Sequence, residues 1–171
     1  MKIRTVILAV STLFGIVSCS SPSILTKPSQ YNAFDLCDRY RSFLQGGLSM
    51  SDAAVDAPIG TEAGGTVGWT AICNGRHSQT RLIGMLQVSK PRIDGPLDTL
   101  DADYHPITGF EGKAWLDTPF PNWTEVHVED GTWIAEMSFV KETPEQELLN
   151  PDDVQQVAKF LVQVAHDLRN S

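Results

Sequence analysis

The segment Trp123 to Lys141 constrains the fold of this chain most strongly. It contains two strand patterns, 123–129 and 132–141, separated by Asp130-Gly131, a dipeptide that favours a tight turn between antiparallel strands. In the second pattern apolar residues alternate with polar ones, so one side of the strand would carry Trp133, Ala135, Met137 and Phe139. A sheet with one apolar face needs a second layer to bury it. The segment therefore predicts an antiparallel sheet that is covered on one side.

Helical patterns at both ends of the chain can supply that layer. Near the C-terminus Asn150 can cap a helix, Pro151 suits its first turn, and an apolar stripe runs from Val154 to Leu168. A shorter pattern with Asn32 as its cap ends at Gly46-Gly47. Further strand patterns cover 67–73, 80–89 and 113–116. We expect an α+β fold: an antiparallel sheet of about five strands with N- and C-terminal helices packed on one face.

The first 19 residues are typical of an exported lipoprotein. Lys2 and Arg4 precede an apolar run of about 12 residues, which is short of the ~20 needed to span a bilayer. The run ends in a lipobox-like sequence, Ile16-Val17-Ser18-Cys19. Residues 1–18 are therefore predicted to be a signal peptide, with lipidated Cys19 anchoring the mature protein at the extracytoplasmic face of the cell membrane. The alternative is a plain secretory signal cut near Ser18, which leaves a free thiol.

Residues 19–31 form a predicted tether rich in Ser and Pro, and residues 32–171 have the length of one domain. With Cys19 assigned to lipid, Cys37 and Cys73 remain as one pair in an oxidising compartment, and a disulfide is the economical interpretation. A redox pair or metal thiolates would normally show closer spacing and nearby histidines. Trp69 shares the period-two pattern of Cys73, so we expect it to pack beside the bridge.

The charge of the chain limits its partners. The chain has 13 basic and 21 acidic residues, and loss of Lys2 and Arg4 with the signal leaves 11 against 21, a net charge of −10. Such a surface argues against nucleic acid and against anionic lipid head groups as partners, and it leaves cationic ligands open. Solubility alone also accounts for it.

The cysteine pattern resembles a known family. Phe34-Asp35-Leu36-Cys37 would open the first helix, and Gly68-Trp69-Thr70-Ala71-Ile72-Cys73 would end a strand beside a tryptophan. With the closing helix from Asn150 to Arg169, the chain resembles small actinobacterial envelope lipoproteins of unknown function that have one internal cysteine pair. The resemblance implies a PsbP-like α+β sandwich and no established activity.

The sequence holds no nucleophile elbow, zincin motif or phosphate-binding glycine loop, so we expect no enzymatic activity and no cofactor. The expected function is a non-catalytic binding module for an apolar molecule or an envelope protein. Four aromatic residues are the candidates for its ligand site or, equally, for the core: Phe110, Trp115, Phe120 and Trp123.

Two alternatives stay open. A hydrolase-type enzyme could use His105 or His127 with carboxylates. Asp101, Asp103 and His105 alternate in a loop and are weak candidates for a calcium-type metal site, although a solvated acidic loop explains them as well.

Overall fold

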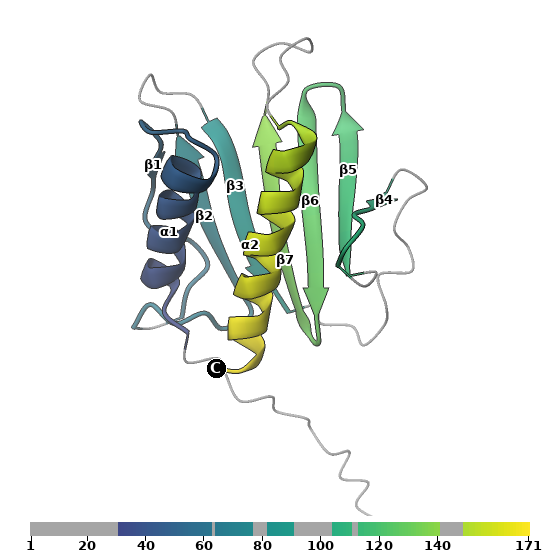
Figure 1. The fold of residues 1–171 in the computed structure, drawn as a ribbon. Helices are drawn as coiled ribbons and strands as arrows, with labels where there is room; N and C mark the ends of the chain where they lie inside the picture. The colour runs from purple at the N-terminus through teal and green to yellow at the C-terminus, as the bar shows by residue number, and fades with distance from the viewer. Residues whose placement is uncertain (1–30, 63, 77–81, 91–103, 111–112, 141–148) are drawn as a thin grey trace, which may run out of the picture.

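The computed structural model describes residues 31–62, 64–76, 82–90, 104–110, 113–140 and 149–171. They form a seven-stranded antiparallel sheet in the order β1-β2-β3-β7-β6-β5-β4 (Figure 1). The strands are β1 (Ala54–Val55), β2 (Thr70–Arg76), β3 (Leu82–Ser89), β4 (His105–Pro106), β5 (Ala114–Phe120), β6 (Trp123–Asp130) and β7 (Trp133–Val140). The helices are α1 (Ala33–Ser42), which continues into a π-helical turn (Phe43–Gly47), and α2 (Pro151–Arg169).

Both helices lie in front of the sheet in Figure 1, with α1 against β1 and β2 and α2 against β6 and β7. The α+β class and the antiparallel sheet are therefore confirmed. The expected number of about five strands is wrong, because β1 and β4 add a two-residue strand at each edge of the sheet. Two residues carry too little alternation to be recognised as a strand in a sequence.

Capping residues define where both helices begin. Asn150 accepts hydrogen bonds from the backbone amides of Asp152 and Asp153, and the Asp153 carboxylate accepts one from the Asn150 amide. These bonds satisfy amides that have no partner inside the first turn. Asn32 caps α1 in the same manner through the Phe34 amide. The residues expected to cap the two helices do so.

A disulfide between Cys37 and Cys73 joins α1 to β2, with the two Cα atoms 5.4 Å apart. Gly75, two residues further along β2, allows the helix to approach closely, because a Cβ there would lie 3.0 Å from the Tyr40 hydroxyl. The expected cysteine pairing is confirmed. Tyr40 is fully buried at this contact, and burial raises the pKa of its hydroxyl.

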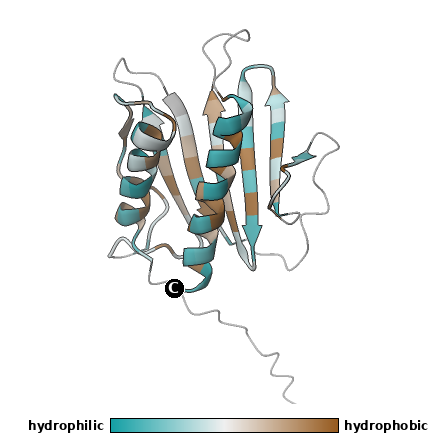
Figure 2. Cartoon of the chain, viewed as in Figure 1, coloured by the Kyte–Doolittle hydropathy of each residue, from teal (hydrophilic) through white to brown (hydrophobic). Residues whose placement is uncertain are grey.

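The core lies between the helices and the sheet. The predicted apolar face of β7 is confirmed, since Trp133, Ala135, Met137 and Phe139 are each at most 1% exposed. The predicted stripe of α2 packs opposite it, from Val157 to Leu168. Figure 2 shows the underlying pattern, in which hydrophobic and hydrophilic residues alternate along β5 and β6.

The prediction for Trp69 is wrong. The residue is 49% exposed and precedes β2, which begins at Thr70, so the strand alternation does not extend back to it. Cys73 and Val67 are fully buried, whereas about half of Trp69 is exposed.

The turn between β6 and β7 differs by one residue from the expected one. Asp130 pairs with Trp133, so the two turn residues are Gly131 and Thr132, and Asp130 belongs to β6. Gly131 has a φ of +64°. Two-residue hairpin turns need a positive φ at their first position, and glycine adopts it without strain. This shift decides which side chains of the two strands lie opposite one another.

Candidate functional site

The sheet face opposite α1 and α2, which we call the far face, carries side chains that are more polar than those of the core. Its centre follows from the strand register, because paired residues of neighbouring strands point to the same side. Two adjacent rows cross five strands: Ile72, Gln87, Glu136, His127 and Trp115 in one, and Asn74, Met85, Ser138, Glu125 and Asp117 in the other.

Three ionisable side chains of these two rows lie close together on β6 and β7. His127 Nε2 lies 3.2 Å from Glu125 Oε2, and His127 Nδ1 lies 3.5 Å from Glu136 Oε2. Glu125 and His127 are two residues apart on β6, and Glu136 is the register partner of His127 on β7. One ligand atom from each side chain lies within 4.8 Å of the other two. We call these three residues the carboxylate–imidazole cluster.

The cluster is shielded from water although it is on the far face. The side chains of Glu125, His127 and Glu136 are 16%, 9% and 20% exposed. Tyr104 packs edge-on against the imidazole with ring centroids 5.1 Å apart, and its hydroxyl lies 3.4 Å from His127 Nε2. Trp115 on β5 is the register partner of His127 from the other side. His127 therefore lies on the far face, but it is buried there.

The lysines and arginines that the structure describes do not balance the charge of the two glutamates. Every ion pair that a described lysine or arginine forms goes elsewhere, to Asp38, Asp56, Asp130 or Asp167. Burial raises the pKa of the Glu136 carboxyl, the neighbouring imidazole opposes the shift, and the Glu125 carboxylate adds to it. Two carboxylates thus share one imidazole in a poorly solvated place, an arrangement that favours uptake of positive charge.

Asp117 adds a third carboxylate beside the cluster. It is the register partner of Glu125, so it projects from the same face, and it is only 7% exposed. Its Oδ1 atom is buried without a hydrogen-bond partner. A buried acceptor without a partner costs about 1 to 3 kcal/mol, so Asp117 Oδ1 is free to accept a hydrogen bond from a water molecule or a bound species.

The four aromatic candidates do not form one site. Phe110 is half-buried on the helix side and lines a cavity of about 240 Å³ with Lys113 and Val162. Trp115 and Trp123 belong to the far face, and Phe120, 60% exposed, contacts Trp123 at a ring distance of 6.4 Å. Trp115 is the one of the four whose register partner belongs to the carboxylate–imidazole cluster.

The other predicted site residues lie away from the cluster or outside the described residues. His105 is exposed in β4 and pairs with Leu116. Asp101 and Asp103 fall outside the described residues, as does Cys19 with the whole predicted signal peptide and tether to residue 30. Lipidation and the loop metal site therefore stay predictions.

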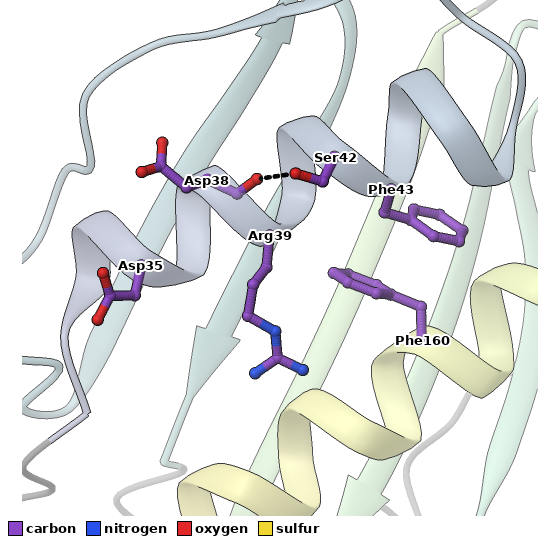
Figure 3. A pocket seen from close by; sticks show the side chains of 6 residues that line it. All are labelled: Asp35, Asp38, Arg39, Ser42, Phe43 and Phe160. Atoms are coloured by element: carbon purple, nitrogen blue, oxygen red, sulfur yellow. Dashed lines mark hydrogen bonds between the residues drawn. The ribbon is translucent and has the colours of Figure 1, made fainter.

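A groove of about 550 Å³ lies between α1 and α2. Figure 3 shows Phe43 and Phe160 facing one another across it, with ring centroids 4.4 Å apart, and Arg39 extending between the helices. The guanidinium of Arg39 is already engaged, since it donates to Asp167 Oδ2 at 2.8 Å and to the Tyr31 hydroxyl. These contacts fasten the two helices together, and the groove offers a ligand little beyond exposed carboxylates.

The carboxylate–imidazole cluster was missed in the sequence. Glu125 and Glu136 appear there as polar residues of alternating strands, and only the register of β6 on β7 brings them to the same imidazole.

Among the helices that the structure describes, none has the length and the apolar character that a membrane span requires. Comparison with models of protein families, with curated proteins and with solved structures finds no match to this chain.

Proposed function

We propose that this protein is a membrane-anchored, non-catalytic binding protein of the cell envelope whose ligand is a cation held on the far face. The observation that carries the proposal is the burial of two carboxylates around His127 with no lysine or arginine paired to them among the described residues. Buried carboxylates normally have such a partner or bind an ion. The ligand is thus assigned to a charged species in place of the apolar molecule expected from the sequence.

The cellular location is part of the same proposal. The disulfide between Cys37 and Cys73 supports an oxidising, exported environment, and the sequence around Cys19 supports a lipid anchor. Replacing Cys19 by Ala should release the protein from the membrane fraction on cell fractionation. Full retention of Cys19→Ala in that fraction would remove the lipid anchor from the proposal.

Native mass spectrometry tests the binding function. The full chain would be purified from membranes in detergent, as wild type, as the double variant Glu125→Gln/Glu136→Gln, and as the control Asp38→Asn, whose carboxylate is exposed on α1. We expect a cationic species to add mass to the wild type and the control but not to the double variant. The same added mass in all three proteins, or no added mass in any of them, would contradict the proposal.

A hydrolase is the second candidate, since His127 lies between two carboxylates that could orient it as a general base. The nearest hydroxyl in register, that of Ser138, is 2% exposed and forms no hydrogen bond with His127 in the described part of the chain. Among the described residues the hydroxyl that reaches His127 is that of Tyr104, at 3.4 Å from Nε2, and no serine, threonine or cysteine forms a hydrogen bond with this imidazole. Hydrolysis of activated esters that His127→Gln abolishes would favour this candidate.

A further inference from the structure

The carboxylate–imidazole cluster has the donor set and the spacing of a metal site. We propose that Glu125, His127 and Glu136 bind one divalent transition-metal ion of the zinc class, and that Asp117 accepts a hydrogen bond from a water molecule on that ion. This inference rests on the proposed function and narrows its cation to one chemical class.

The distances fit a small ion. Two ligands that each lie about 2.1 Å from a tetrahedral zinc are about 3.4 Å from one another. His127 Nε2 lies 3.2 Å from Glu125 Oε2, so these two atoms have the spacing of ligands to one ion, whereas Glu136 Oε2 lies 3.5 Å from the other imidazole nitrogen, Nδ1. The remaining separations are at most 4.8 Å, within the range that rotation of a glutamate side chain can close. The imidazole would coordinate through one nitrogen, and the glutamate that lies beside the other nitrogen would turn its carboxylate toward the ion.

The ligand types select the ion. Calcium requires six to eight oxygen ligands, and magnesium keeps most of its waters in an octahedral shell. One imidazole with two carboxylates suits zinc and related ions, which accept nitrogen and oxygen together. The charge also fits, because an ion of charge +2 neutralises Glu125 and Glu136, which no described lysine or arginine pairs with.

One observation beyond the cluster points to a ligand. Asp117 Oδ1 is buried without a partner on the same face, next to Glu125 in register. Three protein ligands leave a fourth position of a tetrahedral ion to water, as in zinc sites that are not closed. That water has protons to donate, so it would supply the partner that Asp117 lacks. Asp117 is thus a positioning residue and not a ligand.

Isothermal titration of Zn²⁺ into the full chain in detergent, freed of metal with a chelator, tests the inference. We expect one ion per chain and no displacement of it by excess Ca²⁺. Glu125→Gln, His127→Gln and Glu136→Gln should each weaken binding by more than about 100-fold, because loss of an outer partner alone weakens metal sites 10- to 100-fold. Asp117→Asn should weaken it by about tenfold.

The matched control is His166→Gln, which removes an imidazole that lies 3.6 Å from the Asp130 carboxylate at an exposed place on α2. Its affinity for Zn²⁺ should equal that of the wild type. Co²⁺ gives a second measurement, since a tetrahedral site with nitrogen and oxygen ligands should produce visible absorption in the wild type that His127→Gln loses. Circular dichroism of each variant establishes that it is folded.

Zinc affinity that is unchanged in His127→Gln, or calcium that binds as tightly as zinc, would overturn the inference. The proposed function would survive that outcome if native mass spectrometry still found another cation that Glu125→Gln/Glu136→Gln loses. If neither experiment detects a cation that depends on the cluster, both proposals fail.

Discussion

The two faces of the sheet differ in how a buried carboxylate is paired. On the helix-covered face Asp130, with a side chain 10% exposed, meets Arg169 at 2.6 Å, His166 at 3.6 Å and Lys113 at 3.9 Å. On the far face Asp117 is equally buried, and its Oδ1 has no partner. Asp130 thus joins the β6–β7 turn to the end of α2, whereas Asp117 stabilises nothing that the structure describes.

This difference indicates how the two faces are used. The helix-covered face is a packed core in which the carboxylate of Asp130 is paired, although the Tyr40 hydroxyl is buried there without a partner. The far face holds buried carboxylates that no described lysine or arginine pairs with, which is expected to cost stability in the absence of a ligand. Stability given up at one place while the rest of the fold is well packed is common at functional sites, and the following predictions test whether the two faces divide in this way.

Removal of the disulfide should have the largest effect on stability. Cys37 and Cys73 are 36 residues apart in the sequence. A bridge over that distance restricts the unfolded chain, and the chain-entropy model gives a stabilisation of about 4 kcal/mol, which the variant would lose. Urea unfolding of Cys37→Ser/Cys73→Ser at low temperature measures the loss. Zinc affinity of the folded variant should remain that of the wild type, because the bridge lies on the helix-covered face. A loss below about 1 kcal/mol, or weakened zinc binding, would contradict this separation of the faces.

Alanine substitutions at two neighbouring residues of β3 should give the next largest loss of stability, and the losses should differ between the faces. Leu86 is fully buried beneath the helices, and Met85, half-buried, points to the far face. Leu86→Ala should cost about 3 kcal/mol, in the usual range for a core leucine. Met85→Ala should cost about 1 kcal/mol, because less of its surface leaves water on folding. Equal losses in thermal unfolding would show that the far face is packed as a core too.

The helix-covered face could be predicted from the sequence because it depends on local pattern. The apolar period of β7 and of α2 identifies which side chains are buried without knowledge of their partners. The disulfide could be predicted because only Cys37 and Cys73 remain once Cys19 is assigned to lipid. Trp69 was misplaced because the same period was extended beyond the first residue of β2, where the backbone leaves the sheet.

The far-face cluster depends on register, which a single residue in a turn decides. If Asp130 and Gly131 are taken as the turn residues, His127 lies opposite Ile134. The structure has Gly131 and Thr132 in the turn, and His127 then lies opposite Glu136. A glycine at the first position of a two-residue turn was the available signal. Tyr104 and Asp117 could not be added, since β5 had been expected to end at Leu116 and carries a register shift after Asp117.

Loss of the Asp130 carboxylate should have an intermediate effect. Asp130→Asn keeps the shape of the side chain but removes the charge that meets three basic groups, of which Arg169 is the closest. Because those partners are about half exposed, solvent screens them, and we expect a loss of about 1 to 2 kcal/mol. The loss should fall in 1 M salt, as measured by urea unfolding. A neutral effect at low salt would mean that Asp130 is no better satisfied than Asp117.

The smallest effect should have the opposite sign and lie on the far face. Asp117→Val removes a buried acceptor without a partner and places a β-branched residue in a strand, so the metal-free chain should gain about 1 kcal/mol. Tyr40→Phe is the matched control on the helix-covered face, since the Tyr40 hydroxyl is also buried without a partner. Both variants should melt slightly higher than the wild type, but only Asp117→Val should also bind zinc more weakly. If Tyr40→Phe weakened zinc binding as well, the effect would reflect the whole fold, and the assignment of Asp117 to the metal's water would be lost. If Asp117→Val instead lowered the melting temperature, its carboxylate would be satisfied within the chain, and the contrast between the two faces would not hold.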